Sequence, residues 1–149
     1  VELVIKINKI GKHIEEKFAH KYYSQIGLGI DFTARDIQEE CKKKGLPWEK
    51  SKGFDGSAQI SKVFLNKSDL KTNNIDFHLE KNGNIVQSGN SSNMIFSFEK
   101  IISYISKFYS LKIGDLIYTG TPAGVGKIEK NDILDGFIGN KKMLTVTIK

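Results

Sequence analysis

Acidic side chains that could ligate a metal occur in two strand-like runs near the start of the sequence. Glu2 lies in "VELVIKI" and Asp31 lies near the end of "IGLGIDF", and both runs have the composition of β-strands. Carboxylate oxygens on neighbouring strands are hard ligands that suit Mg²⁺ or Mn²⁺. Two strand acids are, however, more often solvated surface residues, so spacing alone leaves both interpretations open.

The only arginine of the chain, Arg35, stands among 22 lysines at the start of a predicted helix. Arg35 and Gln38 are three residues apart and therefore project from one helix face, near an N-terminus whose free N–H groups favour an anion. A planar guanidinium can hold a carboxylate through two hydrogen bonds, which an ammonium cannot do. The alternative is a surface ion pair between Arg35 and Glu39, which contributes little to stability.

A third stretch, "YTGTPAGVGK", looks at first like a phosphate-binding loop. Thr121 stands where that motif requires a glycine, and Ile128 replaces the Ser or Thr that would hold Mg²⁺, so a nucleotide loop is excluded. What remains is a strand that runs into a Gly-rich loop, whose N–H groups and threonine hydroxyls could cradle a carboxylate. A simple turn is the alternative.

The elements that must position these residues can be predicted from periodicity. Strands are expected at 1–7 and 26–32, with a short helix within 13–23. Thr33 is expected to cap the next helix, with Asp36 three residues later, and Gly45 and Pro47 should end it.

The second half of the sequence is also rich in strand patterns. An Asn82-Gly83 turn predicts a hairpin over 75–89. The stretch 97–110 is expected to be an amphipathic helix, and strands should follow at 115–120 and 143–149. The predicted apolar face of that helix consists of Ile101, Ile102, Ile105 and Phe108. These patterns indicate a β-rich α+β fold with a few helices, and the three histidines, His13, His20 and His78, are expected to be surface or strand residues.

Composition limits the class of protein. A chain of 149 residues with 39% hydrophobic content can bury one core, and nothing divides it, so we expect one domain over 1–149. The net charge of +6 comes from scattered lysines without an arginine cluster, which argues against nucleic-acid binding. A single cysteine and the lack of a long apolar run predict a cytoplasmic protein that is not inserted in a membrane. Because Val1 already lies inside a strand-like run, we expect a preceding segment.

Three longer segments carry a family resemblance. In order and spacing, "GIDFTARDIQEECKKKGLPWEKSKGFDGSA", "GNSSNMIFSFEKIISYIS" and "LKIGDLIYTGTPAGVG" resemble the fumarylacetoacetate hydrolase family, most closely its acylpyruvate hydrolase and oxaloacetate decarboxylase branch. The resemblance implies a mixed β-sandwich roll with a few short helices and a homodimer. It also implies a Mg²⁺ or Mn²⁺ ion held by an acid–x–acid pair and an aspartate.

The resemblance assigns metal ligands to positions of this sequence. Asp31 matches the aspartate of the family motif, and Glu2 matches the second acid of the pair. The first acid of the pair, and the family's His–Glu pair, would lie before Val1.

The resemblance also assigns substrate groups. It implies that Lys52 and Arg35 stabilise developing negative charge and that Gln38 orients substrate or water. Gly120 and Thr121 would hold the substrate carboxylate.

The implied function is metal-dependent hydrolysis or decarboxylation of acylpyruvate-like 2-oxo acids through an enolate. Isomerisation or hydration of 2-hydroxy-dienoates, or oxaloacetate tautomerisation, would use the same chemistry on the same fold. An alternative of another class is a catalytically silent binding domain.

Overall fold

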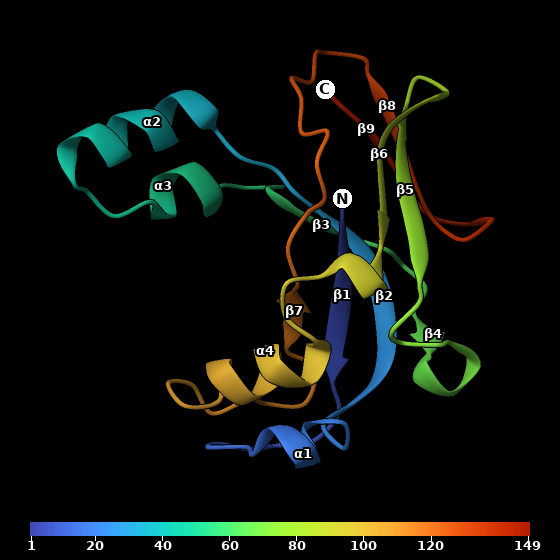
Figure 1. Ribbon diagram of the computed structural model, residues 1–149. Helices are drawn as coiled ribbons and strands as arrows, with labels where there is room; N and C mark the ends of the chain where they lie inside the picture. The colour runs from blue at the N-terminus through green and yellow to red at the C-terminus, as the bar shows by residue number, and fades with distance from the viewer.

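Two antiparallel β-sheets form the body of the chain, and the computed structural model describes residues 1–149. The first sheet has the strand order β3-β2-β1-β7, with β4 also paired to β2, and the second has the order β6-β5-β8-β9 (Figure 1). The expected β-rich α+β class with short helices is confirmed. The strands are β1 (Glu2–Ile7), β2 (Tyr23–Asp31), β3 (Ala58–Ile60), β4 (Leu65–Asn66), β5 (Asp76–Lys81), β6 (Asn84–Asn90), β7 (Leu116–Tyr118), β8 (Ile133–Ile138) and β9 (Lys141–Thr147).

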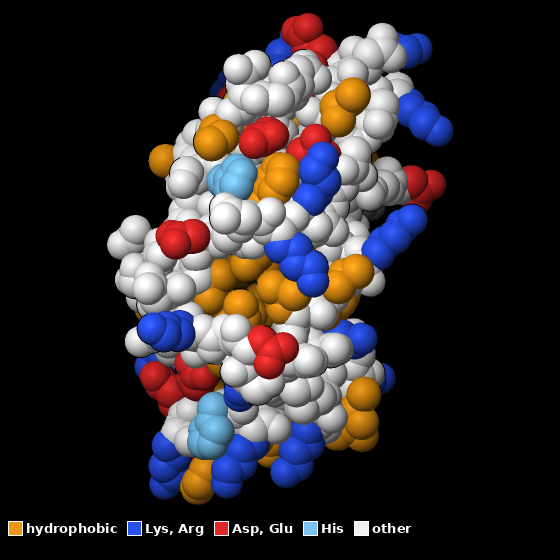
Figure 2. Space-filling model, turned by 90° about the vertical axis from the view of Figure 1, so that its right-hand side faces the viewer, with side chains coloured by type: hydrophobic (Ala, Val, Ile, Leu, Met, Phe, Trp, Pro, Cys, Tyr) orange, Lys and Arg blue, Asp and Glu red, His pale blue; other side chains and the backbone are white.

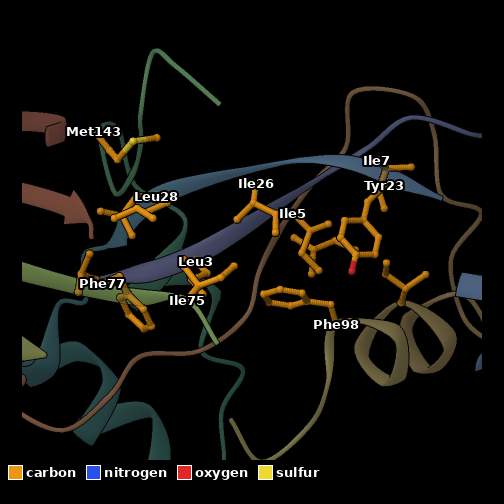
Figure 3. Close-up of a cluster of buried hydrophobic side chains, with 14 of the residues drawn as sticks. Leu3, Ile5, Ile7, Tyr23, Ile26, Leu28, Ile75, Phe77, Phe98 and Met143 are labelled. Atoms are coloured by element: carbon orange, nitrogen blue, oxygen red, sulfur yellow. The ribbon is translucent and has the colours of Figure 1, made fainter. Parts of the chain in front are cut away.

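One hydrophobic cluster of 21 buried residues draws on both sheets. Strand β1 lies between β2 and β7, and its alternate residues Leu3, Ile5 and Ile7 all belong to this cluster. Leu3 and Ile5 are fully buried there beside Ile26 and Leu28 of β2, and Phe77 of the second sheet lies at the Leu3 and Leu28 end of the cluster (Figure 3). Burial of large aliphatic side chains contributes about 1.5–3 kcal/mol each, so this cluster fixes the position of β1.

Four helices join the strands: α1 (Glu16–Ala19), α2 (Arg35–Lys44), α3 (Glu49–Lys52) and α4 (Phe98–Ile105). Two 3-10 turns, η1 (Lys67–Asp69) and η2 (Ser91–Asn93), add single turns. Helices α2 and α3 project together from the sheets, next to the ends of β2 and β3, whereas α1 and α4 lie at the opposite end of β1 (Figure 1). None of these helices has the length and hydropathy required to cross a membrane.

The ends of α2 show one prediction confirmed and one wrong. Gly45 has φ 63° and donates its N–H to the carbonyls of Cys41 and Lys42, so it ends the helix as expected. The expected Thr33 cap is wrong, because the N-cap is Ala34 and no side chain caps the helix. The hydroxyl of Thr33 instead accepts a hydrogen bond from Lys52.

The hairpin and the last helix behave as local sequence rules predict, with one exception. Asn82 and Gly83 both have positive φ, at 52° and 80°, as a tight two-residue hairpin turn requires. Ser97 caps α4 by accepting the N–H of Lys100, and Ile102 is fully buried. Phe108 does not join that apolar face: α4 ends at Ile105, and Phe108 is 63% exposed.

Charges of both signs are mixed on the face shown in Figure 2, and apolar side chains appear at the floor of a hollow there. The lysines form no continuous stripe on this face.

Candidate metal and substrate site

The register of β1 and β2 brings Glu2 and Asp31 to one face of the first sheet. Glu2 lies directly opposite Gly29 in the antiparallel ladder. Because side chains alternate along a strand, Asp31, two residues beyond Gly29, projects from the same face as Glu2. The two carboxyl groups are therefore diagonal neighbours, close enough that the charge of Asp31 affects the pKa of Glu2.

Glu2 is a buried carboxylate, with 7% of the residue exposed. Its Oε2 accepts the backbone N–H of Gly120 at 2.7 Å, while Oε1 makes no hydrogen bond. Burial raises the pKa of the Glu2 carboxyl, the hydrogen bond from Gly120 opposes that rise, and the charge of Asp31 adds to it. A nearby cation stabilises the charged form of a buried carboxyl group such as that of Glu2.

Lys52 supplies one such cation. Its Nζ lies 2.5 Å from Oδ2 of Asp31 and 2.8 Å from Oγ1 of Thr33. Helix α3 can present Lys52 at this point because the N–H of Ala34 donates to the carbonyl of Ser51 at 3.0 Å. Two residues distant in the sequence, Asp31 and Lys52, thus form the polar centre of the site.

Arg35 and Gln38 contact each other as the helical spacing predicts. Nη1 of Arg35 donates to Oε1 of Gln38 at 3.1 Å, and Gln38 is only 6% exposed. Arg35 forms no ion pair with Glu39. Both residues lie at the start of α2, and no hydrogen bond joins either of them to Lys52.

The Gly-rich loop after β7 is tied to the start of β1. The hydroxyl of Thr121 donates to the carbonyl of Val1 at 2.9 Å, and Gly120 reaches Glu2 through its N–H with a φ of 99°. A positive φ of this size favours glycine. The Gly120 N–H is therefore engaged by Glu2, and Thr121, although exposed, makes hydrogen bonds within the chain.

Sequence reasoning did not single out Tyr118 and Gln87. Tyr118 shares the face of Glu2, because it pairs with Val4, and its hydroxyl donates to the carbonyl of Gln59 at 2.8 Å. Burial, with the charges of Glu2 and Asp31, raises the pKa of Tyr118. The position of Tyr118 directly before "TGTP" is the sequence feature that could have identified it as a site residue. No sequence feature identifies Gln87.

The donor set fits a hard, partly hydrated divalent ion. Glu2 and Asp31 each keep one carboxylate oxygen without a hydrogen-bond partner in the chain. No group of three or more His, Cys, Asp or Glu residues is placed to hold a metal. Mg²⁺ commonly binds through one or two carboxylates and retains several waters, so two acids suffice for the protein's share of such a site.

Comparison with known proteins gives a match over nearly the whole chain. Residues 1–146 match the family profile described as "Fumarylacetoacetate (FAA) hydrolase C-terminal". The chain is 42% identical over 149 residues to "Oxaloacetate tautomerase FAHD1, mitochondrial" of Mus musculus, covering 100% of this chain and 67% of the relative. It is 43% identical over 135 residues to "Oxaloacetate decarboxylase, mitochondrial" of Dictyostelium discoideum, covering 90% and 62%.

The fold is shared with solved structures. Fumarylpyruvate hydrolase from Pseudomonas aeruginosa, solved in complex with Mn²⁺ and pyruvate, superposes with a TM-score of 0.92 at 34% identity. That match covers 99% of this chain and 63% of the other. The chain spans between 60% and 67% of the length of its first curated relatives.

Proposed function

The chain belongs to the fumarylacetoacetate hydrolase C-terminal family, and from this membership we propose that it is the metal-binding part of an enzyme acting on 2-oxo acids. The proposed reactions are hydrolysis or decarboxylation of acylpyruvate-like substrates by cleavage of a C–C bond. In oxaloacetate decarboxylation the bond between C3 and the distal carboxylate breaks and CO₂ leaves. The electron pair of that bond stays on the remaining fragment, which is the enolate of pyruvate.

One observation carries the proposal: Glu2 and Asp31 lie together on one sheet face, each with a free oxygen, and Lys52 lies beside Asp31. A divalent ion, Mg²⁺ or Mn²⁺, held by these acids would act as a Lewis acid for the 2-keto group and lower the energy of the enolate. The Mn²⁺ and pyruvate named with the Pseudomonas aeruginosa structure support this ligand chemistry.

The remaining polar residues have roles consistent with their positions. Lys52 holds a positive charge next to the metal ligands, where it would stabilise an enolate oxygen. Arg35 would bind a carboxylate of the substrate, with Gln38 fixing the guanidinium from the buried side of the helix. Thr121 and Gly120 would border the carboxylate on the other side.

Oxaloacetate tautomerisation is a second candidate, because the Mus musculus relative bears that name. It moves a proton from C3 to the 2-keto oxygen through an enolate of oxaloacetate, so a C–H bond breaks, an O–H bond forms and every C–C bond stays intact. The two candidates differ in product, since only decarboxylation or hydrolysis releases pyruvate from oxaloacetate or acetylpyruvate.

We also propose a homodimer and a cytoplasmic location. Ile95 and Phe96, in the "NMIF" segment, are 89% and 58% exposed, which suits a subunit contact. The word "mitochondrial" stands in the names of several relatives and applies to those proteins.

The direct test is turnover by the full-length protein. Oxaloacetate and acetylpyruvate are supplied with Mn²⁺ or with a chelator, and pyruvate release and enol absorbance are followed. Metal-dependent pyruvate release is the expected result, and a metal-dependent enol signal alone would favour the tautomerase. Absence of both would support the silent binding domain.

A further inference from the structure

Gln87 is a buried amide whose hydrogen bonds all lead from the second sheet to the candidate site. It lies on β6 and is 5% exposed. Its Nε2 donates to Oγ1 of Thr121 at 2.9 Å and to the carbonyl of Pro122 at 3.1 Å, while Oε1 accepts from the nitrogen of Val1 at 2.7 Å. A buried amide with three such partners is costly to replace by a group that leaves any of them unpaired.

The loop is also packed closely against β6 around Gln87. A Cβ at Gly124 would lie 2.3 Å from the carbonyl oxygen of Val86, and one at Gly89 would lie 3.2 Å from Cγ of Pro122. Close approach on both sides of Gln87 leaves the loop little freedom to move along the strand. The second sheet therefore acts as the support of the loop.

These contacts lead to the carboxylate of Glu2 by a short path. Thr121, held by Gln87, donates to the carbonyl of Val1, and Gln87 itself accepts from the Val1 nitrogen. The carbonyl of the residue before Glu2 is thus held by a hydroxyl that Gln87 itself holds. Gly120, the neighbour of Thr121, donates its N–H to the Glu2 carboxylate.

We propose that Gln87 is a positioning residue, which fixes the Glu2 carboxylate for metal binding by holding Val1 and the loop at Thr121. The inference rests on the proposed function, because Glu2 is a ligand only in that account. Partners that orient metal ligands typically change metal affinity or activity by about 10–100-fold when removed. A glutamine is suited to this role because its amide donates to the loop and accepts from the strand at once.

The test measures Mn²⁺ binding to the full-length protein by calorimetry and exchange of the Gly120 amide by NMR without metal. Gln87→Met keeps the side-chain volume and removes all three hydrogen bonds. Gln87→Glu keeps the acceptor for Val1 and removes the donors to the loop. It replaces Gln87→Met in both measurements if the methionine variant folds poorly. The control is Ser106→Ala, which removes a buried hydrogen bond to Ile14 at the far end of β1.

We expect Gln87→Met and Gln87→Glu to bind Mn²⁺ about tenfold more weakly and to exchange the Gly120 amide faster, while Ser106→Ala lowers Tm without either effect. Wild-type Mn²⁺ affinity and Gly120 exchange in a folded Gln87 variant would overturn the inference. A wild-type protein that bound no Mn²⁺ would contradict the proposed function instead. Gly120 exchange would then decide alone whether Gln87 positions the Glu2 carboxylate.

Discussion

Asp31 and Lys52 form an ion pair in which Oδ2 and Nζ are 2.5 Å apart, between the end of a strand and a short helix. The two side chains are 30% and 38% exposed, so the pair contributes little to stability. Its importance lies in where it puts an ammonium, next to the acids proposed to bind the metal.

Lys52→Ala is expected to lower kcat about a hundredfold while changing KM less. An ammonium at a developing enolate interacts more strongly with the transition state than with the ground state, and loss of one such group costs about 3 kcal/mol. Lys50→Ala, on the same helix and exposed, is the matched control and should retain wild-type kinetics. A normal kcat in Lys52→Ala would exclude Lys52 from the chemistry.

Arg35→Lys is expected to lose nearly as much kcat/KM as Arg35→Ala. If Arg35 holds a carboxylate through a planar fork while donating to Gln38, an ammonium cannot reproduce that geometry. Steady-state kinetics on both variants, with thermal melts to separate folding from catalysis, test this. Full activity of Arg35→Lys would show that only the charge at this position matters.

Gly124→Ala should destabilise the protein and Gly126→Ala should not. Gly124 has φ 99° and its Cβ would collide with the carbonyl of Val86, so a cost of at least about 1 kcal/mol is expected. A Cβ at Gly126 meets nothing within 4 Å, and its effect should stay within about 0.5 kcal/mol. Urea unfolding of both variants gives the comparison, and equal stabilities would contradict the close docking of the loop on β6.

Acid should weaken the fold in part through Asp132. The backbone N–H of Glu129, the amide of Asn82 and the ammonium of Lys81 hold the pKa of Asp132 below its ordinary value. A carboxyl with a lowered folded-state pKa contributes stability that is present above its unfolded pKa, about 4, and is lost as the pH falls through the folded pKa.

Asp132→Asn should therefore be less stable than wild type near neutral pH, with the difference shrinking below about pH 4. Asp55→Asn, at an exposed side chain without hydrogen bonds, is the control. Thermal melts across this pH range provide the measurement, and a difference that stayed constant with pH would count against the role of Asp132.

Local features of the fold could be predicted from sequence, and features set by distant contacts could not. The hairpin follows from Asn82-Gly83 because both residues tolerate positive φ. Thr33 has the type and spacing of a cap, but its hydroxyl is taken by Lys52, from a helix that local rules do not bring near. Phe108 continues the apolar period of α4 after the backbone has left the helix.

In the candidate site, too, some features could be predicted from the sequence and others depend on distant contacts. Glu2 and Asp31 were recognisable as strand acids, and the family resemblance selected Lys52 from 22 lysines. Their proximity depends on strand register and on the packing of α3, which no local pattern specifies. Gln87 has no motif of its own, because its partners lie at the two distant segments that it joins.

The most direct test of the account is a calorimetric titration of the full-length protein with Mn²⁺, comparing wild type, Asp31→Asn and the surface control Asp55→Asn. We predict one ion bound per subunit in wild type and Asp55→Asn, because Asp31 and Glu2 supply the hard ligands. We predict no detectable binding in Asp31→Asn, whose fold should persist by circular dichroism. Wild-type affinity in a folded Asp31→Asn protein would contradict the proposed metal site.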